Sequence, residues 1–165
     1  MQEQNQLKKL DYKPMSTFDS LSCNGDLKDI INTAFDSNLD IAGAWGYSKE
    51  LATEIITTDM PLKQFEHIFA SMRAYVEMNM TREVENRYAS INVNEHSRET
   101  IPLDNLTCHK ITYTITAIKE SRYAYFIKEY KDNYGKENFD LNAHFAKRKK
   151  ETLSREVIHW FIIPK

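Results

Sequence analysis

The chain of 165 residues lacks the sequence features of disulfide-rich, exported and membrane-spanning proteins. It has only two cysteines, Cys23 and Cys108, and no run approaches the ~20 apolar residues that span a membrane. Two cysteines this far apart in sequence do not indicate a disulfide framework. The N-terminal segment MQEQNQLKKLDYKP also lacks the apolar stretch of a signal peptide. We therefore expect a cytoplasmic protein with no membrane association.

The sequence also lacks an excess of charge of either sign. Its 22 lysines and arginines nearly balance 24 aspartates and glutamates, for a net charge of −2. This balance gives no overall attraction to nucleic acid or to anionic membranes. A hydrophobic fraction of 41% is typical of a globular protein. Residues 1–22 are polar and aperiodic, so we expect a flexible N-terminal arm, followed by a single α+β domain over residues 23–165.

Apolar residues at helical spacing predict three helices in the N-terminal half. The first begins near Asn24 or Asp26 and has an apolar face of Leu27, Ile30, Ile31, Ala34 and Phe35. The second begins at Ser48, with an apolar face of Leu51, Ala52, Ile55 and Ile56. The third begins at Asp59 and runs to about Asn79, with an apolar face of Leu62, Phe65, Ile68, Phe69, Met72, Tyr75 and Val76.

From Arg87 the apolar period drops from 3.6 to two, which predicts strands. We expect strands at residues 87–94 and 106–118, joined by a connection at residues 95–105 that contains Pro102. Residues 121–134 have strand-forming tyrosines, but their apolar spacing favours a helix, and a shorter helix is expected over residues 141–153. The fold class is therefore α+β, with N-terminal helices followed by a small antiparallel sheet and one or two further helices.

The last strand, REVIHWFIIP, is apolar at both odd and even positions. Such a strand is either covered on both faces within the chain or buried in an interface. A sheet of only three strands also exposes two edges, and pairing across a dimer would cover them. Both features favour a homodimer.

Glycine is scarce, yet two of the four glycines lie in the segment IAGAWGYSKE around Trp45. We interpret Gly43 and Gly46 as a tight joint between the first two helices, with Trp45 and Tyr47 filling the gap. The alternative is an aromatic lid, or an anion site at the start of the second helix. Neither GxGxxG nor GxxxxGK occurs, so no known phosphate-binding signature supports that alternative.

The residues that could perform catalysis do not assemble in the sequence. Cys108 and His109 are neighbours on a predicted strand and point to opposite faces, so they cannot share one metal ion. His109 and His159 fall on apolar stretches and could meet across adjacent strands, but we interpret them as satisfied polar groups in or beside the core. No pair of carboxylates lies within an apolar run, where a raised pKa would mark an acid or base. The residues predict no metal and no cofactor.

One basic run stands out, formed by Lys147, Arg148, Lys149 and Lys150. Four consecutive cations cannot share one face of a helix, because each residue turns the helix by 100°. We interpret the run as a solvated helix surface, with a short phosphate-contacting patch as the alternative.

Three functions agree with these features, in this order. The first is a non-enzymatic binding or interaction module, which acts as a homodimer through its sheet edge or aromatic helix faces, with a further protein partner as an extension. The second is a small-molecule-binding domain or enzyme with a pocket between helices and sheet, lined by Trp45, Tyr47, His109, Tyr113 and His159. The third is a nucleic-acid-associated protein that uses Lys147, Arg148, Lys149 and Lys150. The sequence leaves open whether the protein is an enzyme.

Overall fold

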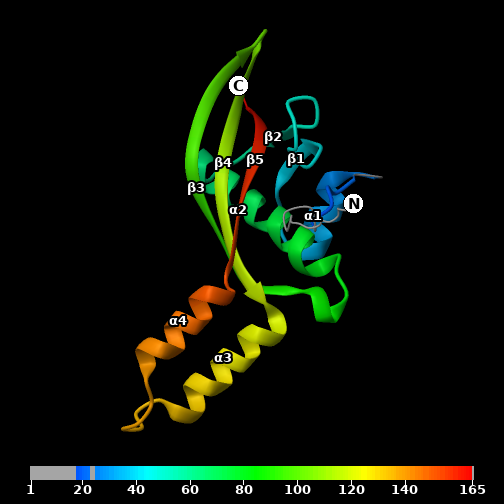
Figure 1. Cartoon of the computed structure of the whole chain (residues 1–165). Helices are drawn as coiled ribbons and strands as arrows, with labels where there is room; N and C mark the ends of the chain where they lie inside the picture. The colour runs from blue at the N-terminus through cyan, green and yellow to red at the C-terminus, as the bar shows by residue number, and fades with distance from the viewer. Residues whose placement is uncertain (1–17, 23–24, 165) are drawn as a thin grey trace, which may run out of the picture.

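The fold combines a curved five-stranded sheet with four α-helices, as a computed structural model of residues 18–22 and 25–164 describes it (Figure 1). The strand order in the sheet is β1-β2-β5-β4-β3. The elements in chain order are α1 (Leu27–Phe35), β1 (Asp40–Gly43), β2 (Thr53–Thr57), α2 (Leu62–Tyr75), β3 (Tyr88–Leu103), β4 (Leu106–Lys119), α3 (Glu120–Asn133), α4 (Leu141–Glu151) and β5 (Leu153–Ile163).

The three long C-terminal strands form the main part of the sheet. β3 and β4 are joined by a two-residue turn, in which Asp104 has a positive φ of 52°. β4 and β5 pair in antiparallel register from Thr107 opposite Ile163 to Ala117 opposite Leu153. β2 runs parallel to β5, with Thr53 opposite Phe161. The class α+β is confirmed, but the prediction of an antiparallel sheet is wrong, because the β2–β5 pair makes the sheet mixed.

The prediction of a wholly helical N-terminal half is also wrong. α1 lies where the spacing of Leu27 and Ile31 predicted a helix, with Asp26 as its cap, and α2 continues through a π-helical turn at Val76–Met80. The segment between them is not a helix. It contains β1 and β2, which pair in antiparallel fashion with Ile41 opposite Ile55.

Further along the chain, the interpretation of residues 95–105 as a connection is wrong, because β3 continues through Pro102 to Leu103. A proline can lie in this strand because β3 is at the edge of the sheet, where its missing N–H breaks no ladder.

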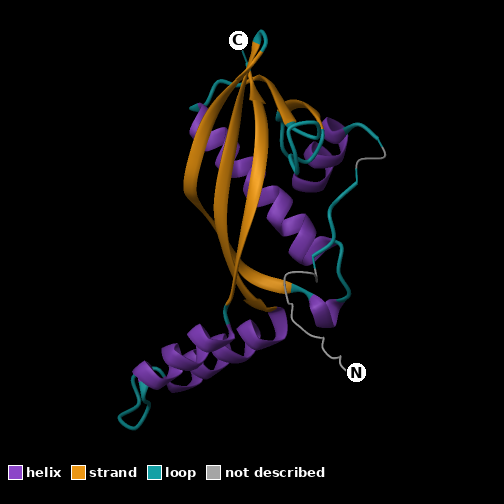
Figure 2. Ribbon diagram, turned by 45° about the horizontal axis from the view of Figure 1, so that its top comes forward, coloured by secondary structure: helices purple, strands orange, loops and turns teal. Residues whose placement is uncertain are grey.

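The core lies between α2 and one face of the sheet, as the tilted view of Figure 2 shows. It is built mainly from Phe65 and Phe69 of α2, Ile111 and Ile115 of β4, and Phe161 of β5. Phe18 and Leu21, in the short described segment that precedes α1, pack against this core. Residues 1–17, the rest of the predicted arm, lie outside the described residues.

The opposite face of the sheet is not covered by any element of the described chain (Figures 1 and 2). We call it the open face. Its residues alternate with the core residues along each strand and include Asn92, Asn94, Ser97 and Glu99 of β3, Lys110, Thr112, Thr114 and Thr116 of β4, and Glu156, Ile158, Trp160 and Ile162 of β5. Cys108 of β4 points to the same face, opposite Ile162, but is fully buried.

α3 and α4 form a helical hairpin that projects from one end of the sheet (Figures 1 and 2). The helices predicted at residues 121–134 and 141–153 are therefore present. The interior of the hairpin holds His144, whose Nδ1 lies 2.7 Å from Glu129 Oε1 among the rings of Phe126, Tyr130 and Phe139.

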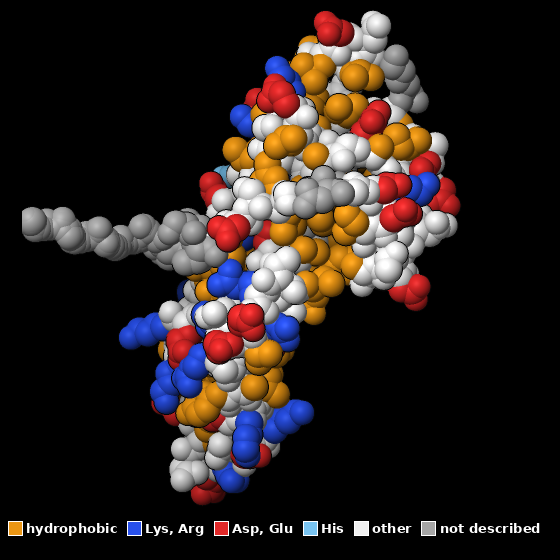
Figure 3. Space-filling model, turned by 90° about the vertical axis from the view of Figure 1, so that its right-hand side faces the viewer, with side chains coloured by type: hydrophobic (Ala, Val, Ile, Leu, Met, Phe, Trp, Pro, Cys, Tyr) orange, Lys and Arg blue, Asp and Glu red, His pale blue; other side chains and the backbone are white. Residues whose placement is uncertain are grey.

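The basic run lies on α4, and Figure 3 shows many lysine and arginine side chains on the lower lobe that the hairpin forms. Lys147, Lys149 and Lys150 are exposed, whereas Arg148 is half-buried with its guanidinium 5.2 Å from the ring centre of Tyr123.

Candidate functional site

α2 and the π-helical turn that continues it bury three ionisable residues against the sheet. The exposed fractions of Glu66, Arg73 and Glu77 are 0%, 3% and 3%. Their spacing of seven and four residues keeps them on one side of the helix, together with Phe69 and Ala70. The sequence argument that no ionisable groups converge is therefore wrong. Two clusters form along this buried polar face, one around Arg73 and one around Glu66.

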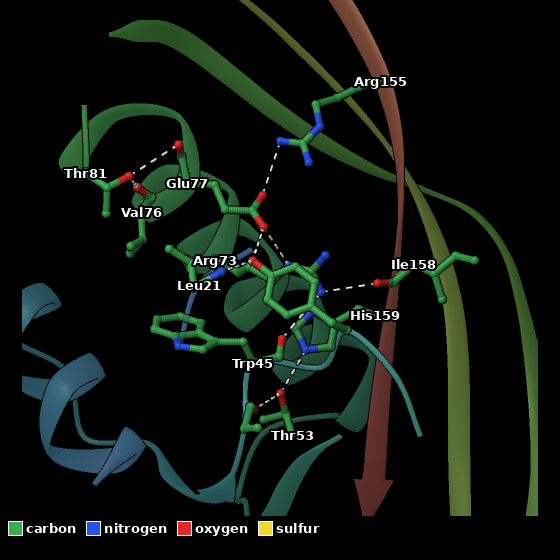
Figure 4. Close-up of polar contacts among 12 residues, drawn as sticks. Leu21, Trp45, Thr53, Arg73, Val76, Glu77, Thr81, Arg155, Ile158 and His159 are labelled. Atoms are coloured by element: carbon green, nitrogen blue, oxygen red, sulfur yellow. Dashed lines mark hydrogen bonds and ion pairs between the residues drawn. The ribbon is translucent and has the colours of Figure 1, made fainter. Parts of the chain in front are cut away.

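The Arg73 cluster consists of Arg73, Glu77, Arg155 and Tyr47, of which Figure 4 labels the first three. Glu77 accepts hydrogen bonds from Arg73 Nε at 3.3 Å and from Arg155 Nη1 at 3.2 Å, and the Tyr47 hydroxyl also donates to it. The Tyr47 hydroxyl in turn accepts from the backbone N–H of Leu21 at 2.9 Å. The cluster thus links α2, β5, the β1–β2 loop and the segment before α1.

The backbone completes the coordination of Arg73. Its Nη1 donates to the carbonyl of Ile158 at 3.2 Å and to that of Trp45 at 3.4 Å, and its guanidinium lies 4.1 Å from the ring centre of Tyr47. A buried charge with this many acceptors is stabilising only as a complete set, because the loss of one partner leaves an uncompensated charge. Burial lowers the pKa of Arg155 and raises the pKa of Tyr47.

The segment IAGAWGYSKE is the loop between β1 and β2, and it packs onto β5. Gly46 accepts a hydrogen bond from Trp160 N at 2.8 Å, and Trp45 is 3% exposed with its indole stacked at 6.0 Å on Phe69. The space beneath Trp45 is therefore filled by protein. The interpretation as a packing joint fits this geometry, although the joint connects two strands and not two helices.

His159 is buried beneath Gly46. Its Nε2 lies 2.9 Å from Thr53 Oγ1, and its ring stacks on Phe161 with centroids 4.1 Å apart. The Thr53 hydroxyl donates to Ala44 O at 2.7 Å, so His159 must carry its proton on Nε2 and donate to Thr53. Burial, and secondarily the charge of Arg73, holds the pKa of His159 well below its usual value.

The Glu66 cluster consists of Glu66, His109, Arg98 and Glu95. Glu66 Oε2 lies 2.5 Å from His109 Nδ1, and Glu66 Oε1 accepts from Arg98 Nη2 at 3.1 Å. Arg98 also binds Glu95 through two hydrogen bonds, at 2.8 Å from Nε and 2.7 Å from Nη2. The hydrogen bonds from Arg98 lower the pKa of Glu95. Tyr113 of β4 lies opposite Glu95 of β3. The pKa of Tyr113 is raised first by burial and then by the charges of Glu66 and Glu95.

The five predicted pocket residues fall into two groups. His109 and Tyr113 lie at the Glu66 cluster, and Trp45, Tyr47 and His159 lie around Arg73. The two histidines do not pair with each other: His109 is bonded to Glu66 and His159 to Thr53. Cys108, by contrast, points to the other side of the sheet from His109 and is a buried free thiol.

Sequence reasoning missed Glu66, Arg73, Glu77, Arg98 and Arg155. The available signal was the helical spacing of Glu66, Arg73 and Glu77 along α2 and its π-helical continuation, which places them in line with the buried Phe69 and Ala70. No group of three or more His, Cys, Asp or Glu side chains within the described ranges could hold a metal ion. None of the helices described is long and apolar enough to cross a membrane.

No protein-family model, curated protein or solved structure matches this chain.

Proposed function

We propose that the protein is a non-enzymatic interaction module that acts as a homodimer through its open face. The observation that carries this proposal is the uncovered side of β5. His159 and Phe161 point inward and are buried, at 1% and 0% exposure. Ile158 points outward and is 40% exposed, beside the half-buried Trp160 and Ile162. The described residues leave this apolar row uncovered, and an interface with a second copy of the chain would bury it.

The face of the sheet is a better interface than its edges. β1 has only four residues. β3 is long, but its pairing with β4 is interrupted by register shifts between Ala89 and Asn92 and between Glu95 and Ser97, and it contains Pro102. Bulges, charges and proline are features that prevent edge strands from pairing with another chain. We therefore place the dimer contact on the open face and not at β3.

The charges of the open face suit a second copy of the same chain. Lys110 is its one cation and lies 5.3 Å from the ring centre of Trp160. Glu156 precedes the apolar row on β5, and Glu99 of β3 lies opposite Lys110. A twofold axis through the row would pack isoleucine and tryptophan in the centre and bring each Lys110 toward acidic residues of the second copy. Two sheets packed in this way lie about 10 Å apart.

The test is the mass of the particle in solution and its response to Ile158→Glu. Wild-type protein should be a dimer by light scattering at micromolar concentration. A glutamate at position 158 would be buried without a partner in the interface, so this variant should be monomeric with an unchanged circular dichroism spectrum.

Ile30→Glu is the matched control, since Ile30 of α1 is also 40% exposed but lies away from the open face. It should remain a dimer. A monomeric wild-type protein, or equal loss of the dimer in both variants, would refute the proposal.

A further inference from the structure

His109 and Arg98 carry hydrogen-bonding groups that no described residue uses. The contact of 2.5 Å between His109 Nδ1 and Glu66 Oε2 requires a proton between them, because a nitrogen lone pair would repel the carboxylate. Nδ1 is therefore a donor. Its Nε2 makes no hydrogen bond within the described part of the chain, and the side chain is 11% exposed.

The same protonation leaves one nitrogen of Arg98 without an acceptor. Arg98 Nη1 lies 3.4 Å from His109 Nδ1, but both atoms are donors, so this contact is not a hydrogen bond. The other two nitrogens of Arg98 are occupied by Glu66 and Glu95. The side chain of Arg98 is 28% exposed, so a molecule from solvent can approach its guanidinium group.

We propose that Arg98 Nη1 and His109 Nε2 bind a small oxyanion, a carboxylate or a phosphate group, and that a proton is taken up at His109 Nε2 as it binds. Arg98 would donate to one oxygen of the anion. A neutral His109 would present a lone pair to a second oxygen and repel it, whereas protonated Nε2–H donates to it. The proton comes from solvent and remains on the imidazole while the anion is bound.

The charges around His109 suit an anion only when His109 is protonated. Glu66 faces it from α2, and Lys63 of α2 lies 3.9 Å from Glu95. Glu95 and Arg98 face it from β3, and Tyr113 of β4 is neutral. When His109 is protonated, the carboxylates of Glu66 and Glu95 are outnumbered by the three positive charges of Arg98, Lys63 and the imidazolium. One net positive charge is then left for a monoanion to neutralise.

A second observation points to a polar molecule or ion between α2 and the sheet. The Tyr113 hydroxyl is buried, at 1% exposure of the residue, and has no hydrogen-bond partner in the described structure. Buried hydroxyls nearly always have a partner, and an unpaired one calls for an explanation such as a bound ion or water. The hydroxyl is on the same face of β4 as His109, four residues along the strand.

The experiment is a titration of ¹⁵N-histidine-labelled protein, followed by the ring nitrogen resonances of His109. Acetate is the probe for a carboxylate and inorganic phosphate the probe for a phosphate, with sodium chloride matched for ionic strength. One of the two anions should move the Nε2 resonance of His109 toward the protonated form. Because the anion binds together with one proton, its affinity should fall as the pH rises, by up to about tenfold for each pH unit.

Arg98→Gln removes the cation that binds the anion and should weaken binding by about tenfold or more. His67→Gln is the control, because His67 is exposed on the outer side of α2, and it should leave the affinity unchanged. The amide spectrum of each variant verifies the fold. If neither anion shifts His109 beyond chloride, or if Arg98→Gln binds as the wild type does, Glu66 and His109 are a structural ion pair only and the proposal is wrong. Ile158→Glu should bind the anion normally, so this test is independent of the homodimer.

Discussion

At the scale of single residues, Gly46 is the position with the least freedom to change. Its φ of +94° is one that residues with a side chain rarely adopt, and a Cβ there would lie 2.1 Å from His159 Cδ2. The ring of His159 cannot retreat, because Phe161 stacks on it and Thr53 Oγ1 accepts a hydrogen bond from its Nε2. A glycine is therefore required both by the backbone and by the packing of the β1–β2 loop on β5.

We predict that Gly46→Ala lowers the free energy of unfolding by roughly 3–5 kcal/mol, from backbone strain and overpacking together. Gly135→Ala is the matched control, since Gly135 has a similar φ of +87° but nothing lies within 4 Å of its Cβ position. It should lose only about 1–2 kcal/mol, the cost of the backbone alone. Urea denaturation of both variants measures the difference, and equal losses would show that His159 does not restrict position 46.

His159 should make the fold sensitive to acid. Because its folded-state pKa lies well below the usual 6.5, the unfolded chain binds a proton that the folded protein excludes. The stability that this residue confers is therefore present above pH 6.5 and is lost as the pH falls, by up to about 1.4 kcal/mol per pH unit for one proton.

We predict that His159→Gln reduces the slope of unfolding free energy against pH between pH 6.5 and 5, as measured by urea denaturation at each pH. Glutamine keeps an N–H that can donate to Thr53 but has no proton to gain. His67→Gln, on the exposed side of α2, should retain the wild-type slope. If His159→Gln and His67→Gln both keep the wild-type slope, His159 is not the source of the acid sensitivity.

At the scale of elements, local patterns were sufficient for most of the fold. The alternation in β4 and the helical spacing in α2 and α3 depend on residues that are close in sequence, and each element is present. The helix expected from Ser48 was wrong because β2 pairs with β5, which begins about a hundred residues later. The β-branched residues Thr53, Ile55 and Ile56 of β2 favour a strand. However, five residues are too few for the spacing of apolar residues to distinguish a strand from a helix.

The candidate site was harder to predict than the fold, because its contacts also join residues that are far apart in sequence. His109 and His159 could be placed near the core from the apolar residues beside them. The burial of Glu66 and Glu77 could not, because each is tolerated only through a partner from a distant strand, Arg98 for Glu66 and Arg155 for Glu77. From sequence alone, a carboxylate on an apolar helix face is expected to be exposed to solvent, because its burial requires a counterion that the local sequence does not identify.

At the scale of the whole molecule, the α3–α4 hairpin is an excursion from an otherwise continuous β4–β5 pair. Ala117 lies opposite Leu153, so the two strands are already adjacent where the hairpin leaves and returns. The body keeps α2, the sheet and both buried clusters without it. The hairpin also exposes aromatic side chains, with Tyr125 at 45%, Tyr134 at 65% and Phe145 at 47%. These residues offer a second way to form a dimer, through aromatic helix faces.

Removal of the hairpin separates the two modes of dimerisation. We predict that a chain in which residues 120–151 are replaced by a short glycine-containing turn still folds, with a stability loss of about 1–3 kcal/mol, because Ile118 at the end of β4 becomes more exposed. It should remain a dimer by light scattering, since the open face is intact, and Ile158→Glu in the same shortened chain should make it monomeric. A shortened chain that folds but is monomeric would instead assign the dimer contact to Tyr125, Tyr134 and Phe145, and the exposed row on β5 would then need a different partner.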